Sequence, residues 1–208
     1  MKRFCFLMTL LTLFSVIIRA NDIKFPPELI WWVNEIKKGN KNIAIEDFIL
    51  TEHKTERIDR NYADHQNNRR LIYPVFMRWN YSGDYVAYLD FYSIQLIRQL
   101  SGKYRIINTG DDTEVLLIAD KNKNVFYIDG FGIFYGLDAI QWLNDNILIG
   151  VGVLIGDNSI DLLIYEYKIN EDTIEIKKYC YRNAFSIEVW HLLKLKWFEQ
   201  RPDYFEIK

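Results

Sequence analysis

The sequence predicts a mainly β protein, and two observations carry this prediction. Beyond about residue 70, short apolar runs alternate with polar turns, and no helical period between them is long enough for a parallel crossover. Aromatic residues make up 16% of the chain, and aromatic and β-branched residues favour strands. We therefore expect antiparallel hairpin or meander sheets, sandwich-like or partial propeller-like, with one N-terminal amphipathic helix.

The first residues are typical of an export signal. Lys2 and Arg3 precede a largely apolar run from Phe4 to Ile18, and the small residue Ala20 follows. This run is short for a membrane span, which needs roughly 20 apolar residues. We predict a signal peptide at residues 1–20, a secreted or periplasmic (cell envelope) location and no membrane span after cleavage. A retained membrane anchor and an ordinary core helix are the alternatives.

The remaining chain, residues 21–208, is predicted to form a single β-rich domain. Removal of residues 1–20 would take three of the 26 basic residues and none of the 28 acidic ones, which leaves a formal charge of −5. A general binder of nucleic acid or of an anionic membrane would need a basic face, so this charge argues against both classes and we predict no nucleic-acid partner. Cys180 would be the one remaining cysteine, so no internal disulfide can form and packing must stabilise the fold. The oligomeric state is left open.

The N-terminal helix is predicted just after two prolines. Pro26 and Pro27 suit a first helical turn, and Gly39 suits a left-handed C-terminal cap. The apolar residues that share one face at helical spacing are Leu29, Trp32, Val33 and Ile36.

Next we expect a short strand and a long polar loop. Residues 42–50 (NIAIEDFIL) alternate well enough for a strand. Residues 51–70 are polar apart from Ile58 and Tyr62, and we predict a loop there. Long loops in compact domains are often functional, so this loop is a candidate partner-binding segment, with a plain solvated loop as the alternative.

The rest of the chain is predicted as successive strands separated by polar turns. The expected strands are residues 71–77, 85–91, 104–108, 114–119, 125–129, 147–154, 161–169 and 173–181. The expected turns are YSGD, DKNKN, LNDN, GDNS and NEDT. For the C-terminal stretch from Ala184 we expect a short helical turn followed by a terminal strand.

Two similar units occur within this region. Trp79 precedes the turn NYSGD and an apolar strand, and Trp142 precedes the turn LNDN and a second apolar strand, each followed later by a hairpin. We expect both tryptophans to anchor the core. The arrangement over residues 78–181 resembles the blade repeat of TolB-like and WD-like β-propellers, although two copies are too few to close a propeller. No function of that family is carried over.

The stretch DGFGIFYGLD is the candidate ligand-binding site. Its glycines lack the spacing of a dinucleotide-binding loop, but aromatic side chains stand beside carboxylates, a combination that can hold sugars or peptides. Structural packing of the glycines and aromatic rings is the alternative. The candidate residues are Asp129, Phe131, Phe134, Tyr135 and Asp138.

No motif in the chain names a reaction. The three histidines form no zinc-hydrolase pair, residues 120–124 lack the later ligands of a calcium loop, and no serine-hydrolase elbow occurs. Cys180 is expected to be a buried thiol. We therefore predict no metal and no cofactor, and we leave enzyme activity open, with a non-catalytic role favoured.

The function predicted from the sequence is an exported, non-catalytic envelope or extracellular protein that binds a protein or glycan partner. The alternative is a secreted hydrolase that acts on glycan or peptide, with Asp129 and Asp138 as its acids. Two carboxylates facing each other across an aromatic cleft would favour the hydrolase.

Overall fold

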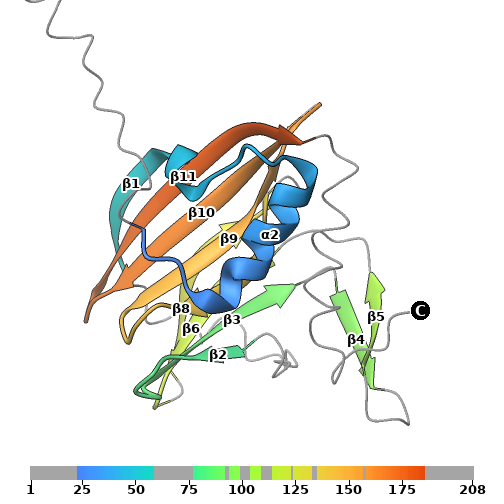
Figure 1. Ribbon diagram of the computed structural model, residues 1–208. Coiled ribbons are helices and arrows are strands. Elements are labelled where there is room, and N and C mark those ends of the chain that lie inside the picture. Colours follow the sequence, from blue (N-terminus) through green and yellow to red (C-terminus); the bar gives the residue numbers. More distant parts are fainter. Residues whose placement is uncertain are drawn as a thin grey trace, which may run out of the picture.

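The computed structural model describes residues 23–58, 77–91, 94–98, 104–108, 114–122, 124–132, 135–156 and 158–185 (Figure 1). The helical elements are the 3₁₀ turns η2 (Pro27–Leu29) and η3 (Ile45–Asp47) and the helix α2 (Ile30–Gly39). The strands are β1 (Ile49–Arg57), β2 (Met77–Trp79), β3 (Tyr85–Phe91), β4 (Ile94–Arg98), β5 (Tyr104–Asn108), β6 (Glu114–Asp120), β7 (Val125–Phe131), β8 (Tyr135–Trp142), β9 (Ile147–Ile155), β10 (Ile160–Ile169) and β11 (Thr173–Phe185).

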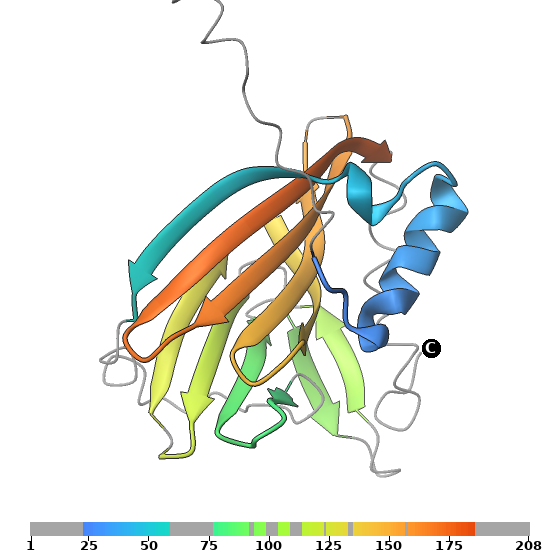
Figure 2. The same cartoon turned by 60° about the vertical axis from the view of Figure 1, so that its left-hand side comes forward.

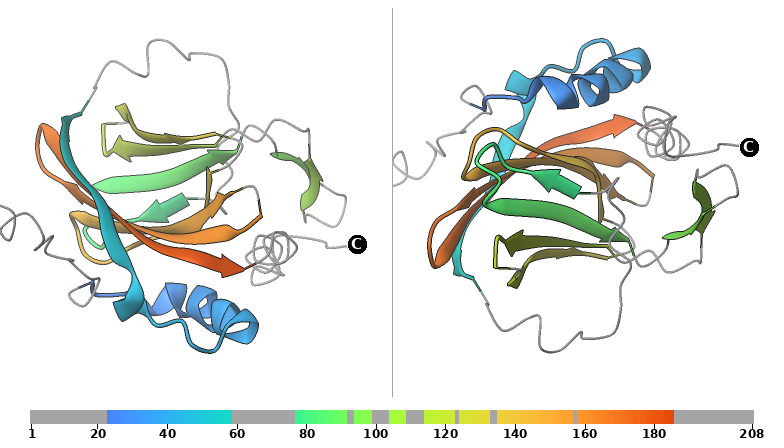
Figure 3. Two further views of the ribbon diagram at one scale, coloured as in Figure 1. Left: turned by 90° about the horizontal axis from the view of Figure 1, so that it is seen from above. Right: turned by 90° about the horizontal axis from the view of Figure 1, so that it is seen from below.

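The strands form two main antiparallel sheets and a separate hairpin. The five-stranded sheet has the order β1-β11-β10-β9-β8, and the four-stranded sheet has the order β2-β3-β6-β7. Strands β4 and β5 pair with each other. The two main sheets lie as layers, with α2 against the outer face of the five-stranded sheet (Figure 3). The prediction of a mainly antiparallel β fold with one N-terminal amphipathic helix is confirmed.

Register decides which side chains of the five-stranded sheet face the four-stranded sheet. Directly opposed residues of an antiparallel pair lie on the same face. Tyr165 is opposite Lys178 and Gly150, and Tyr167 is opposite Ile176 and Leu148. These rows face inward, because the Tyr167 hydroxyl reaches Asp129 on β7 and the ring of Tyr165 meets Phe131.

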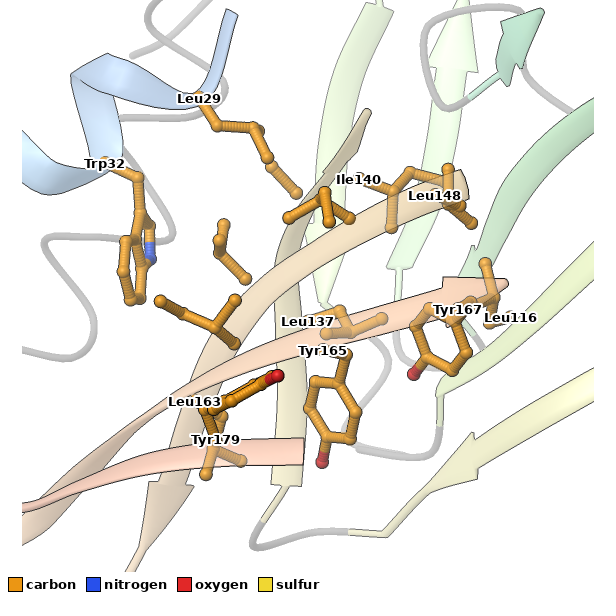
Figure 4. Close-up of a cluster of buried hydrophobic side chains, with 14 of the residues drawn as sticks. Leu29, Trp32, Leu116, Leu137, Ile140, Leu148, Leu163, Tyr165, Tyr167 and Tyr179 are labelled. Carbon is orange, nitrogen blue, oxygen red and sulfur yellow. The ribbon is translucent and has the colours of Figure 1, made fainter. Parts of the chain in front are cut away.

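Helix α2 buries its apolar face on the outer side of the same sheet. Leu29, Trp32 and Ile36 are each at most 2% exposed. Figure 4 shows Leu29 and Trp32 on this side and Tyr165 and Tyr167 on the side of the four-stranded sheet. The predicted helical face is correct, but the predicted left-handed cap at Gly39 is wrong. Gly39 is the last helical residue, and a Cβ there would lie 2.6 Å from the ring of Phe185.

The two tryptophan-led turns close one side of the layered structure. The Trp142 indole donates to the backbone carbonyl of Arg78 over 2.7 Å, and the Asn80 amide donates to the Asp145 carbonyl over 2.9 Å. The Ser82 backbone N–H donates to the Asp145 carboxylate over 2.6 Å. Trp142 is fully buried, whereas Trp79 is 55% exposed, so the prediction that both anchor the core is wrong for Trp79. Ala87 faces the core between the sheets, so its neighbour Val86 faces outward. Trp79 is opposite Val86, and its side chain therefore lies on the outer face of the four-stranded sheet.

The first half of the predicted polar loop is a strand. A strand was predicted over residues 42–50, but residues 45–47 form a 3₁₀ turn and the observed strand β1 begins at Ile49. Strand β1 then continues to Arg57, into the region predicted as a loop. Residues 59–70, with the rest of the predicted loop, lie outside the described residues. So do residues 71–76, the predicted signal peptide and the C-terminal stretch from residue 186.

The predicted strand at residues 71–77 overlaps β2 only at Met77. The strands predicted from residue 85 onward agree with the structure, and β4 and β8 were missed. The five predicted turns each lie where two successive strands are joined, although Asp120 ends β6 and Thr173 begins β11. Within the described ranges no helix is long and apolar enough to cross a membrane.

Candidate functional site

A cleft opens between the two sheets on the side away from the tryptophan-led turns. The edge strands there are β1 of the five-stranded sheet and β7 of the four-stranded sheet, and Figure 2 shows how β1 and β11 arch over β7. The cleft has a volume of about 160 Å³. Its lining residues are Glu52, Lys54, Asp129, Gly130, Phe131, Tyr165, Ile176 and Lys178.

A β-bulge turns Asp129 toward this cleft. Leu116 on β6 is opposite Asp129, but its neighbour Leu117 is opposite Tyr127, so Ile128 is the extra residue of the bulge. Without the extra residue, strict alternation would place Asp129 on the outer face, because Ile128 already faces the core. The bulge therefore makes this carboxylate part of the space between the sheets.

The surroundings of Asp129 change its titration. The Tyr167 hydroxyl donates to Oδ2 over 3.1 Å, and the Gly130 backbone N–H donates to Oδ1 over 2.9 Å. Burial raises the pKa of the Asp129 carboxyl, and this effect exceeds the opposing effects of the two hydrogen bonds and of Lys54. Asp129 therefore takes up a proton more readily than a solvated aspartate.

The inward side chains of β1 carry charges of alternating sign. The Lys54 ammonium lies 3.2 Å from a Glu52 carboxylate oxygen and 2.9 Å from one of Glu56. The bond to Glu56 is the largest effect that raises the pKa of Lys54, to about 12. Glu52 is opposite Lys178 on β11, and the Lys178 ammonium lies 5.6 Å from the centre of the Tyr165 ring. The rim of the cleft thus contains the carboxylates of Glu52 and Asp129 and the ammonium groups of Lys54 and Lys178, with the Glu56 carboxylate beside it.

The floor of the cleft is aromatic and tightly packed. Phe131 meets Tyr165 edge-on at 5.8 Å between ring centres, and Tyr165 stacks on Tyr167 at 5.6 Å. All three rings are at most 5% exposed. They form a buried aromatic base but do not offer an open ring face.

Asp138 lies elsewhere, on the outer face of the five-stranded sheet. A second bulge lies between Leu137 and Ala139, which are opposite Gly152 and Val151, so Asp138 is the extra residue. Its carboxylate is 3% exposed and accepts the Trp32 indole N–H over 2.9 Å. Asp129 and Asp138 are therefore separated by the sheet and do not form a pair of acids.

The structure places one of the other three candidate residues from the DGFGIFYGLD stretch. Phe131 lies in the cleft beside Asp129, as described above. Tyr135 begins β8, but its side chain is outside the described part of the structure, as is the whole of Phe134. The structure thus brings Asp129 and Phe131 together and places Asp138 apart from them.

Sequence reasoning missed the cleft residues on β1, β10 and β11. A signal was present in Glu52, Lys54 and Glu56, because charges of alternating sign at every second position of an extended strand lie on one face and can pair. The run was predicted as a loop because its polar residues show no apolar alternation. For Tyr165 and Lys178 no local signal marks a cleft, since their meeting depends on sheet register.

The other potentially reactive side chains that the structure describes lie away from this cleft or have an environment that does not activate them. Burial raises the pKa of the Cys180 thiol to about 11, as expected of a buried cysteine that is not a nucleophile. The His53 ring lies on the outer face, 2.8 Å from the Glu175 carboxylate. Asp120 accepts from the backbone N–H groups of Asn122 and Asn124, each over 2.9 Å, so its carboxylate caps a hairpin turn. Within the described ranges no group of three potential metal ligands occurs.

Comparison of the chain with models of protein families, with curated proteins and with solved structures finds no match. The resemblance of residues 78–181 to propeller blades is untouched by these results and stays a prediction.

Proposed function

We propose that this chain is an exported, non-catalytic binding protein that receives a protein partner at the cleft between β1 and β7. The observation that carries the proposal is the mixed rim of carboxylates and ammonium groups beside an edge strand. Paired charges around a small apolar base are typical of interaction sites that select a partner by electrostatic complementarity. Export rests on the N-terminal pattern and would be tested by N-terminal sequencing of the exported form, which should begin at or near Asn21.

A protein partner is favoured over a glycan by the state of the aromatic rings. Sugars stack on open ring faces, but Phe131, Tyr165 and Tyr167 are almost completely covered. An edge strand, in contrast, offers backbone donors and acceptors that a protein chain can use.

Photo-cross-linking tests the site of binding. Glu56 points toward the cleft side of β1, and Thr55 points to the opposite face of the same strand. With p-benzoylphenylalanine at position 56, irradiation in cell-envelope extract should give a discrete adduct that position 55 does not give. Equal adducts from both positions, or none from either, would contradict a partner at the cleft. An adduct that consists of glycan would assign the cleft to the other class of partner.

One observation supports the hydrolase alternative in a new form. Asp129 and Glu52 line the same cleft, and the raised pKa of Asp129 favours its acid form, as general-acid catalysis requires. This alternative requires that the purified chain hydrolyse a glycan or peptide and that Asp129→Asn and Glu52→Gln each abolish the reaction.

A further inference from the structure

Strand β1 has an edge that no described strand occupies. It pairs with β11 along nearly its whole length, from Ile49 to Arg57, and it ends the strand order of its sheet. Most of its residues are exposed. An additional extended chain could therefore continue the five-stranded sheet at this edge, as in recognition by strand addition.

The register fixes where the side chains of such a chain would go. Residues opposite Glu52, Lys54 and Glu56 would point into the cleft side. Residues opposite His53 and Thr55 would point outward. The added chain would thus present every second side chain to the space that already contains Asp129.

The charges around the cleft determine which inward side chain fits. Lys54 is already held between Glu52 and Glu56, and Lys178 lies over the Tyr165 ring. Counting Glu52, Lys54, Glu56, Asp129 and Lys178 as ionised, the described charged groups in and beside the cleft carry one excess negative charge. A cationic side chain would balance this excess, whereas an acidic side chain would add repulsion.

We propose that an extended segment of the partner protein pairs with the edge of β1 that no described strand occupies and places a lysine or arginine side chain in the cleft. This inference rests on the proposed function and names the binding mode and the chemistry of the partner.

The dimensions of the cleft agree with this occupant. Its volume of about 160 Å³ equals that of roughly five waters in the liquid, which suits one long side chain and is too small for a drug-sized ligand. Ile176 and the edge of Phe131 would contact the methylene stem, while Glu52 and Asp129 lie within the same cleft for the charged end.

The charged edge also gives selectivity. Inward-pointing charges on an edge strand discourage pairing with uncharged strands, which is a common protection against aggregation. The same charges admit a strand whose inward side chain is cationic. Protection and recognition are therefore compatible on β1.

Peptide binding tests the inference directly. The probes are acetyl-TVTKTVT-amide and matched peptides with Glu or Gln in place of Lys, titrated into the purified full chain and followed by backbone NMR. The Lys peptide should shift β1 amides and bind about tenfold more tightly than the Glu peptide, with the Gln peptide between them. Two further Lys peptides carry N-methyl groups at alternate residues, the first along one backbone edge of the peptide and the second along the other edge. Their affinities should differ, because only one edge of the peptide would pair with β1.

Matched variants separate the cleft from the outer face. Glu52→Gln removes a cleft carboxylate and should weaken the Lys peptide about threefold or more. Glu175→Gln removes a carboxylate from the outer face beside β1 and should leave the affinity unchanged. Equal loss in both variants would overturn the cationic assignment.

Other results would also overturn the inference. They are equal affinity for the Lys and Glu peptides, equal binding of the two methylated peptides, no binding of any peptide, or β1 amides whose outer edge is already protected from hydrogen exchange in the free chain. In each case photo-cross-linking from position 56 would still decide separately whether a partner binds at the cleft.

Discussion

Asp129 and Asp138 are of the same residue type and each lies at a β-bulge, but their surroundings differ. The bulge in β7 turns Asp129 to the cleft, where a hydroxyl and a backbone N–H bind it. The bulge in β8 leaves Asp138 under helix α2, where the Trp32 indole binds it. A carboxylate that fixes the helix to the sheet and a carboxylate that faces a polar cleft are thus separated by one layer of strands. The difference shows that bulge position, more than residue type, assigns each acid its role.

The largest effect is expected for Asp138→Ala. The substitution leaves the buried Trp32 indole N–H without its acceptor and should lower the free energy of unfolding by about 2 kcal/mol. Urea unfolding measures this change, and Asp138→Asn, which keeps an acceptor oxygen, should lose less. If Asp138→Ala were as stable as the parent chain, the carboxylate would not fix the helix.

A smaller loss is expected for Tyr167→Phe on the other side of the sheet. It removes the hydroxyl that donates to Asp129 and should cost about 1 kcal/mol of unfolding free energy. Because this hydrogen bond lowers the pKa of Asp129, the pKa should rise further in the variant. Carbon-13 NMR of the carboxyl measures the pKa, and an unchanged value would show that the hydroxyl does not bind the carboxylate in solution.

Asp129→Asn should affect pH dependence more than stability at any one pH. The pKa of Asp129 is raised in the folded chain, so the folded chain holds this proton at a higher pH than the unfolded chain does. The free energy of unfolding therefore falls as pH rises from the unfolded pKa, near 3.8, through the folded pKa. The asparagine variant lacks this cost and should gain stability relative to the parent over that window. Unfolding free energies at pH 3 and pH 7 give the comparison. A relative loss on going to pH 7 would contradict the sign.

The smallest effect is expected in the chemical labelling of the Cys180 thiol. This labelling shows whether a reagent reaches the interior of the folded chain. With a pKa of about 11 and 7% exposure, its thiol should react with iodoacetamide at pH 8 far more slowly in the folded chain than in urea. The substitutions at Asp138 and Tyr167 should speed the reaction no more than their losses of unfolding free energy predict. Rapid labelling of the parent chain would mean that the sheets open more than the folded structure indicates.

The sequence predicted the parts of the fold that local chemistry determines. The face of α2 at Trp32 and Ile36 followed from helical spacing, and the five turns followed from their polar residues. Each of these depends on neighbours within a few positions.

The predictions that failed concern features that depend on pairing between residues far apart in the sequence. Charged β1 lacks apolar alternation because one of its faces is solvated and the other contains the Glu52, Lys54 and Glu56 group. Its only local signal was the alternating charge of these three residues. The opposite placement of Asp129 and Asp138 depends on two bulges, which periodicity of two cannot anticipate. The cleft itself exists only because β1 and β7, far apart in the chain, form facing edges.

The paired turns at Asn80 and Asp145 have a consequence for how the chain tolerates change. Hairpin tips commonly accept inserted residues, because few contacts depend on them. Here each tip is bonded to the other, so added length in one would displace its partner and separate the sheets at the closed side. Epitope tags or label sites that lengthen either tryptophan-led turn should therefore lower the free energy of unfolding.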